Sequence, residues 1–173
     1  MSPPARIVLV GSMGSGKSTV MEILADRLDC PGLDTDRIVE EREGLTVAQV
    51  FAAEGEDMFR SLELSALEAA LAHGAPVVVA TGGGIVETPA ARRLLEAEPA
   101  VVHLRVSPAV ALERIGSTGS RPLLGDDPAH ALAALEERRR AWWAQVAGAI
   151  VDVDGLSAVA VADEVLSRLE VAA

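Results

Sequence analysis

The feature that most constrains the fold is a glycine-rich motif close to the N-terminus. Residues 11–18 read GSMGSGKS and match the pattern G-x-x-x-x-G-K-[ST]. The motif directly follows a short β-branched run, residues 7–10, and opens a stretch of helical periodicity over residues 16–28. Strand, loop and helix in this order predict backbone N–H groups that converge on phosphate oxygens at the positive end of the helix. A glycine-rich turn that only starts a helix is the alternative.

This loop predicts binding of a nucleoside triphosphate. Lys17 is placed to reach the β- and γ-phosphates, and the Ser18 hydroxyl to bind Mg²⁺. A switch GTPase should also carry a base-reading N-K-x-D, which the sequence lacks, and a motor ATPase needs far more than 173 residues. A small-molecule kinase is the class that these observations favour. The expected nucleotide-binding residues of the loop are Gly11, Ser12, Met13, Gly14, Ser15, Gly16, Lys17, Ser18 and Thr19.

Short apolar runs alternate with longer amphipathic stretches along the chain. This alternation predicts an α/β layer fold with a mostly parallel sheet. Thr46 and Gln49 have capping-box spacing, which predicts a helix that ends near Gly55 and is followed by another over residues 58–71. Three further helices should begin where a capping side chain precedes proline, at residues 88–89, 107–108 and 127–128. The expected strands are residues 7–10, 32–34, 77–80, 101–104 and 150–153, and a closing helix spans residues 157–169.

Composition and charge exclude several classes of protein. The chain has 15 Lys and Arg against 26 Asp and Glu, a net charge of −11, so no nucleic-acid partner is expected. No apolar run approaches the roughly 18 residues of a membrane span, and the N-terminus is not a secretory signal. Cys30, the single cysteine, cannot form an internal disulfide. We expect a cytoplasmic protein with one domain, residues 1–173, and no membrane partner.

The second predicted strand ends in two carboxylates. If the strand runs through both Asp34 and Asp36, their side chains project from the same face, at the end of the sheet where α/β ligands bind. Phosphoryl transfer has two tasks for acids there, holding hydrated Mg²⁺ and accepting the proton of the acceptor hydroxyl. The alternative is acidic capping of a helix that begins near Arg37.

Three charged side chains fall where helical periodicity expects apolar ones. Arg60 and Glu63 lie inside the apolar arc of the helix over residues 58–71. Arg139 occupies a gap in the stripe formed by Leu132, Leu135, Trp142 and Val146. Charges on a buried face are costly unless they are paired or ligand-bound, and arginine binds carboxylate or phosphate in a bidentate manner. The acceptor should therefore carry such a group; a structural Arg60–Glu63 pair and an Arg139 that snorkels to water are the alternatives.

Two further segments point to the same site. Gly82, Gly83 and Gly84 follow a buried strand, which indicates close approach of a ligand or another backbone; a plain turn is the alternative. Residues 116–127 are rich in Gly, Ser and Asp, and are predicted to form a mobile loop. Arg121 in this loop is a candidate for neutralising the moving phosphate, with a solvated loop charge as the alternative.

In order and spacing, these motifs resemble those of shikimate kinases. The resemblance rests on the phosphate loop, LDTD at 33–36, FR at 59–60 with Glu63, GGG at 82–84 and RPLL at 121–124, and it covers residues 6 to about 169. It implies a three-layer P-loop fold of the nucleoside-monophosphate-kinase type, with a five-stranded parallel sheet of order 2-3-1-4-5. A mobile lid would span residues 116–127, and acceptor-binding helices residues 36–72. The implied activity is ATP-dependent phosphorylation of the 3-hydroxyl of shikimate by a monomer, on the route through chorismate to aromatic amino acids.

The resemblance also implies roles for individual residues. Ser18 and Asp34 match the Mg²⁺ ligands, and Arg114 matches an arginine that flanks adenine. The residues that match catalytic positions are Lys17, Asp36 and Arg121, and those that match the acceptor site are Asp36, Arg60, Glu63, Gly82, Gly83, Gly84 and Arg139. Two segments depart from the family pattern. Residues 139–143 read RRAWW instead of R-x-P-x-Y, and the adenine-side loop at 153–156 is short and has no basic residue.

Two rival functions remain open at this point. One is a kinase for another small polyol acid, such as gluconate or a cyclitol, which would share the phosphate loop. The other is a nucleotide-binding regulatory module without turnover. The candidate base Asp36, together with Lys17, Asp34 and Arg121, argues against the second, because a non-catalytic binder needs no base.

Overall fold

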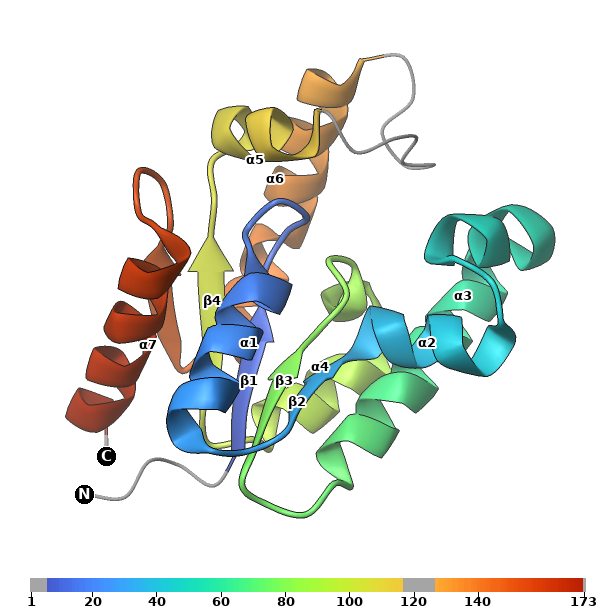
Figure 1. Ribbon diagram of the computed structural model, residues 1–173. Coiled ribbons are helices and arrows are strands. Elements are labelled where there is room, and N and C mark those ends of the chain that lie inside the picture. Colours follow the sequence, from blue (N-terminus) through green and yellow to red (C-terminus); the bar gives the residue numbers. More distant parts are fainter. Residues whose placement is uncertain (1–5, 117–126, 173) are drawn as a thin grey trace.

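The computed structural model describes residues 6–116 and 127–172, and five strands in this part of the chain form one parallel sheet of order β2-β3-β1-β4-β5 (Figure 1). This confirms the predicted sheet, its strand order and the α/β class. Each strand lies within two residues of its predicted bounds. The strands are β1 Arg6–Val10, β2 Gly32–Asp34, β3 Val77–Ala80, β4 Val101–Arg105 and β5 Ala149–Asp152.

Helices cover both faces of the sheet and make it the middle layer of three (Figure 1). Helices α1 and α7 pack together on one face, whereas α3, α4 and α6 contribute to the core on the other. The helices are α1 Lys17–Leu28, α2 Thr35–Glu43, α3 Val47–Leu71, α4 Pro89–Glu96, α5 Pro108–Ile115, α6 Pro128–Val146 and α7 Ala158–Ala172, with a 3₁₀ helix η1 at Ile85–Glu87. Among the described residues, no helix is both long enough and apolar enough to cross a bilayer.

Strand β1 shows why the central strands are mostly apolar. Its alternate side chains point to opposite faces, so Ile7 and Leu9 enter the core under α1 and α7, whereas Val8 and Val10 enter the core under α3, α4 and α6. A parallel sheet covered on both faces has no polar side to present to water. The consequence for function is that polar side chains gather beyond the strand ends.

The helix-start signals are confirmed, although one of the capping side chains makes no cap bond. Thr46 and Gln49 form the capping box of α3, and Gly55 interrupts that helix with φ 80° and ψ 176°, which matches two successive helical segments. Ser107 and Asp127 cap α5 and α6 through their side chains. Helix α4 also begins where it was predicted, at Pro89 after Thr88, but the Thr88 side chain makes no cap bond. The Thr88 backbone N–H bonds to the carbonyl of Ile85 and closes η1, so this residue serves two helices at once.

Candidate active site

The loop between β1 and α1 needs glycine for two separate reasons. Gly11 and Gly14 have φ values of +146° and +80°, which side chains of L-residues rarely adopt. They also touch neighbouring backbone, since a Cβ on Gly11 would lie 2.5 Å from the Leu104 carbonyl oxygen and one on Gly14 would lie 2.9 Å from that of Ala111. The loop is thus packed against the start of α5 and the end of β4, which holds its N–H groups in place.

The amino group of Lys17 lies along this loop. Its Nζ donates to the carbonyl oxygens of Gly11, at 2.7 Å, and Ser12, at 2.8 Å, and to Ser15 Oγ at 3.2 Å. Lys17 is buried, so its charge is only weakly screened by water. An anion at the mouth of the loop would meet this charge directly.

Two residues brace the loop from outside. Arg114 donates through Nη1 to the Gly14 carbonyl oxygen, at 3.1 Å, and through Nη2 to that of Val153, at 3.2 Å. It therefore joins the loop to the segment after β5, where the resemblance expects adenine. Glu136 of α6 accepts a short hydrogen bond from Ser12 Oγ, and sequence reasoning missed this contact because nothing in the α6 pattern marks Glu136.

Asp34 and Asp36 are not both part of a strand, so that expectation is wrong. Strand β2 ends at Asp34, and Asp36 lies in the first turn of α2. Oδ1 of Asp34 accepts from the backbone N–H groups of Asp36, at 2.9 Å, and Arg37, at 3.4 Å, which is the capping role considered as the alternative. Its other oxygen, Oδ2, accepts from Ser18 Oγ at 2.6 Å. One carboxylate thus caps α2 and contacts the loop.

Ser18 and Asp34 have the chemistry that Mg²⁺ requires. A hydroxyl and a carboxylate oxygen in contact are hard ligands, and Mg²⁺ usually takes one or two such groups and fills its remaining positions with water and phosphate. No group of three or more His, Cys, Asp or Glu suited to a metal occurs among the described residues. The arrangement therefore fits a metal ion that is bound partly by these two residues and partly by the phosphates of a nucleotide.

A cavity of about 310 Å³ joins the loop to the charged residues predicted for the acceptor. Three apolar side chains of α3, Val47, Phe51 and Phe59, form part of its wall. The polar and glycine residues that line it are Gly14, Gly16, Lys17, Ser18, Thr19, Asp34, Asp36, Arg60, Glu63, Thr81, Gly83, Gly84 and Arg139, with Met13 beside them. Asp36 thus shares one chamber with Lys17 and with the two arginines. Arg121 lies outside the described residues, as does nearly all of the expected lid, so both remain predictions.

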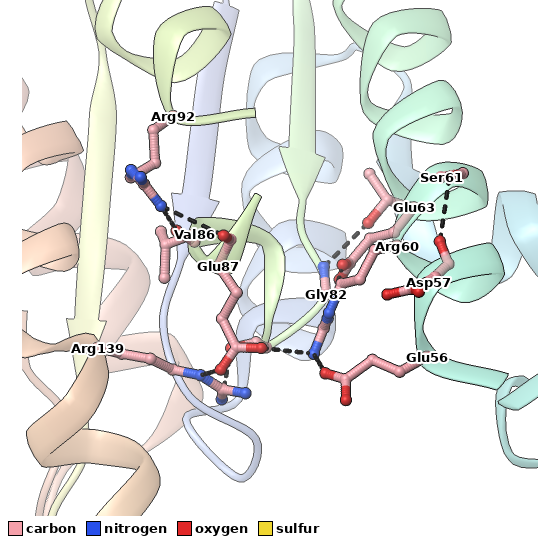
Figure 2. Close-up of polar contacts among 12 residues, drawn as sticks. Glu56, Asp57, Arg60, Ser61, Glu63, Gly82, Val86, Glu87, Arg92 and Arg139 are labelled. Atoms are coloured by element: carbon pink, nitrogen blue, oxygen red, sulfur yellow. Dashed lines mark hydrogen bonds and ion pairs between the residues drawn. The ribbon is translucent and has the colours of Figure 1, made fainter. Parts of the chain in front are cut away.

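Arg60 and Arg139 approach each other from α3 and α6 (Figure 2). Arg60 donates through Nη1 to Glu63 Oε2 at 2.8 Å and through Nη2 to Glu87 Oε2 at 2.8 Å. Arg139 donates through Nε to Glu87 Oε1 at 3.0 Å and through Nη1 to the Gly83 carbonyl oxygen at 2.9 Å. The Arg60–Glu63 ion pair, considered above as the structural alternative, is present, and both of its members also line the cavity.

The stripe that singled out Arg139 is correct except for one member. Arg139 is 1% exposed, so the alternative that it snorkels to water is wrong. Trp143, rather than Trp142, is the buried tryptophan of the stripe, and it stacks on His103 with ring centroids 5.1 Å apart. The step from Arg139 to Trp143 is four residues, which keeps both on one helix face, as a step of three would also have done.

The three glycines lie close to other parts of the site. A Cβ on Gly82 would collide with Glu63 Oε1 and lie 2.7 Å from Asp36 Oδ1, and one on Gly84 would collide with the Arg60 guanidinium. A Cβ on Gly83 would lie 3.0 Å from the backbone nitrogen of Met13 in the phosphate loop. The predicted close approach is therefore confirmed, with side chains of the site at Gly82 and Gly84 and another backbone at Gly83. Gly82 also donates its N–H to Thr35 Oγ1 at 2.9 Å, which ties this segment to α2.

Sequence reasoning missed Glu87, which lies between the two arginines. Its carboxylate contacts Arg60, Arg139 and also Arg138. The sequence carries no clear signal for this role, because the burial of the preceding Ile85 and Val86 is known only from the structure.

The buried carboxylate of Glu63 leads to a testable pH dependence. Burial raises its pKa from the ordinary 4.5 to about 7, although Arg60 acts in the opposite direction. A raised pKa in the folded state gives stability that is fully present below the unfolded value and is lost as the pH rises through about 7. Glu63→Gln should therefore lose less stability than the wild-type protein between about pH 5 and about pH 8. Urea midpoints at both pH values measure this, and equal losses would contradict the raised pKa.

The fold and the cavity together define a class of protein. A G-x-x-x-x-G-K-[ST] loop after the central strand of a 2-3-1-4-5 sheet faces two acids and an arginine pair across one chamber. This is the arrangement of a P-loop phosphotransferase that acts on a small molecule.

Comparisons with known proteins identify the family within that class. The family model described as shikimate kinase matches residues 13–170, and the chain belongs to the shikimate kinase family, whose members are ATP-dependent kinases. A shikimate kinase of Moorella thermoacetica is 46% identical over 167 residues, which cover 96% of this chain and 95% of that protein. The structure of an Acinetobacter baumannii shikimate kinase in complex with shikimate has a TM-score of 0.93 and 32% identity, covering 98% of this chain and 95% of that one. A Sinorhizobium meliloti gluconokinase reaches a TM-score of 0.63 at 26% identity, covering 98% and 93%.

Proposed function

We propose that this protein transfers the γ-phosphoryl group of ATP to the 3-hydroxyl of shikimate, on the route to aromatic amino acids. The observation that carries the proposal is the shared cavity. It joins Lys17 at one end to the Arg60–Arg139 pair, with Asp36 on its wall. A donor phosphate and an acceptor carboxylate can thus be held at once, with a potential base beside the acceptor. Kinship with shikimate kinases supports the same acceptor.

Each residue of the cavity has a task in this reaction. Lys17 binds the β- and γ-phosphates and remains with the transferring group as its charge redistributes. Arg60 and Arg139 hold the acceptor carboxylate, and the backbone at Gly82–Gly84 permits close approach of the ring. Asp36 orients the reacting hydroxyl and accepts its proton. Ser18 and Asp34 would hold Mg²⁺, which neutralises phosphate charge when bound.

The same features weigh against the rival functions. A gluconate or cyclitol kinase requires a different acceptor, and the gluconokinase neighbour is markedly less similar than the shikimate-bound one. A regulatory module without turnover would have no need for a candidate base, Asp36, in the same cavity as Lys17. We further propose that the protein works as a monomer, because residues of one chain supply both the phosphate-binding and the acceptor-binding sides of the cavity.

A coupled assay of ADP release tests the proposed acceptor. The purified protein is supplied with ATP and Mg²⁺, and then with shikimate, gluconate, a cyclitol or no acceptor. The proposal predicts that shikimate gives the highest kcat/KM and that chelation of Mg²⁺ abolishes turnover. Preference for gluconate or the cyclitol would assign a different kinase, and ATP binding without turnover on any acceptor would favour the regulatory module.

Replacing either arginine by lysine should weaken acceptor binding. Lysine keeps the charge of Arg60 or Arg139 but loses the planar fork, so one charged hydrogen bond to the acceptor carboxylate is lost. The expected cost is about 2 kcal/mol, which raises the KM for shikimate about 30-fold and leaves the KM for ATP nearly unchanged. Arg93→Lys, a change on α4 outside the cavity lining, is the control. Normal shikimate binding by Arg139→Lys would contradict the role of that residue.

A further inference from the structure

Glu87 is the one carboxylate that contacts arginines of both α3 and α6 among the described residues (Figure 2). Its Oε2 accepts from Arg60 Nη2 at 2.8 Å, and its Oε1 accepts from Arg139 Nε at 3.0 Å and from Arg138. Glu87 is the last residue of η1, the short helix that follows the triple glycine. The backbone that approaches the acceptor therefore also carries the anion that joins the two arginines.

The hydrogen bonds around Glu87 leave specific donors unused. Arg60 uses Nη1 for Glu63 and Nη2 for Glu87, and Arg139 uses Nε for Glu87 and Nη1 for the Gly83 carbonyl oxygen. Two buried nitrogens, Arg60 Nε and Arg139 Nη2, have no hydrogen-bond partner within the described chain. A buried guanidinium nitrogen without a partner is costly, and an anionic ligand would remove this cost at Arg139, which lines the cavity.

Glu87 also compensates a repulsion between like charges. Burial and the positive charges of Arg60 and Arg138 lower the pKa of Arg139, and Glu87 opposes that shift. Burial acts against the charge of Glu87 itself, yet its bonds from Arg138 and Arg139 and the charge of Arg60 lower its pKa overall. An ionised Glu87 thus allows two guanidinium groups to stay close together in a partly buried site.

We infer that Glu87 is a positioning residue for acceptor binding, which fixes Arg60 and Arg139 in the one relative arrangement that receives a carboxylate. This inference rests on the proposed function, because it requires an acceptor with that group. Glu87 does not act as a substitute for the acceptor, since the contacts it takes leave Arg139 Nη2 unpaired. It sets the spacing of the two guanidinium groups. It therefore affects how tightly the acceptor binds and not how fast the bound acceptor is phosphorylated.

Glu87→Gln tests this inference, because glutamine has the same shape without the charge. The expected result is a KM for shikimate raised about tenfold, with kcat and the KM for ATP within about threefold of wild type; tenfold corresponds to about 1.4 kcal/mol. Glu56→Gln is the matched control: Glu56 also contacts Arg60, at 3.3 Å, but its side chain is 51% exposed and it does not touch Arg139. That variant should behave as wild type.

A second variant separates positioning from charge and guards against misfolding of the first. Glu87→Asp keeps the charge but is one methylene shorter, so it cannot keep both arginine contacts at their present lengths and should also raise the KM for shikimate. A KM that is unchanged or lowered in both variants, or a loss of thermal stability alone, would overturn the inference. An equal effect of Glu56→Gln would overturn it as well. The wild-type protein is measured in parallel, and its failure to use shikimate would instead refute the proposed function.

Discussion

Asp36→Asn is expected to fold and to bind ATP, yet to lose turnover on shikimate by about 10²–10⁴-fold, the range for a general base. Asparagine can still hold the reacting hydroxyl, but its amide cannot accept the proton. Asp36 lies in the first turn of α2, and its Oδ1 faces the position that a Cβ on Gly82 would take. The carboxylate is therefore held against the backbone that the acceptor must approach.

Steady-state rates with saturating shikimate measure this effect, and ATP binding measured separately shows whether the nucleotide site is intact. Asp57→Asn is the control, because Asp57 is exposed on α3 and does not line the cavity. If Asp36→Asn retains a kcat within about tenfold of wild type, the residue positions the hydroxyl and does not accept its proton.

Lys17→Met is expected to lower kcat by at least about 10²–10³-fold, the effect of removing one preorganised donor from a transition state. Methionine is of similar length and apolar, so it can occupy the buried position without the charge. Lys17 is the only lysine of the sequence, and no other amino side chain can replace it. The variant should also bind ATP more weakly, because the bonds from Lys17 to Gly11 and Ser12 that help to fix the loop are lost.

Two readouts distinguish the roles of Lys17. A large fall in kcat together with weaker ATP binding is the expected pattern if, as we propose, the lysine contacts the phosphates before and during transfer. A fall in ATP affinity alone, with kcat preserved at saturating ATP, would mean that Lys17 is only a ground-state ligand. Lys17→Arg keeps the charge but not the compact amino group. Its kcat and its affinity for ATP should lie between those of the wild-type protein and those of Lys17→Met.

Local patterns were sufficient to predict the α/β class and the five strands, whereas the strand order 2-3-1-4-5 was predicted only from the resemblance to shikimate kinases. The phosphate loop identified the first strand and helix, and the alternation of apolar runs with amphipathic stretches identified the other strands. These signals are strong because each depends on residues adjacent in sequence. They also placed the start of α4 at Pro89, although the Thr88 side chain makes no cap bond there. A capping motif indicates where a helix begins, but not whether the side-chain bond forms.

The candidate site was predictable where a charge interrupted an apolar face. Arg60, Glu63 and Arg139 are marked in this way, because burial of an unpaired charge is costly enough to demand a reason. Glu87 and Glu136 were not predicted, since a glutamate in a turn or on a mixed helix face looks solvent-exposed. Their contacts join residues 27 to 124 positions apart in sequence, and only the packing of α3 and α6 against the segments that follow β1 and β3 reveals them.

The most direct test of the central claim is the identity of the product. The protein is incubated with ATP, Mg²⁺ and shikimate, and the phosphorylated product is characterised by ³¹P and ¹H nuclear magnetic resonance. The proposed function predicts a single phosphomonoester whose phosphorus couples to the ring proton at carbon 3. Phosphate on another hydroxyl, or only free phosphate released from ATP, would contradict it.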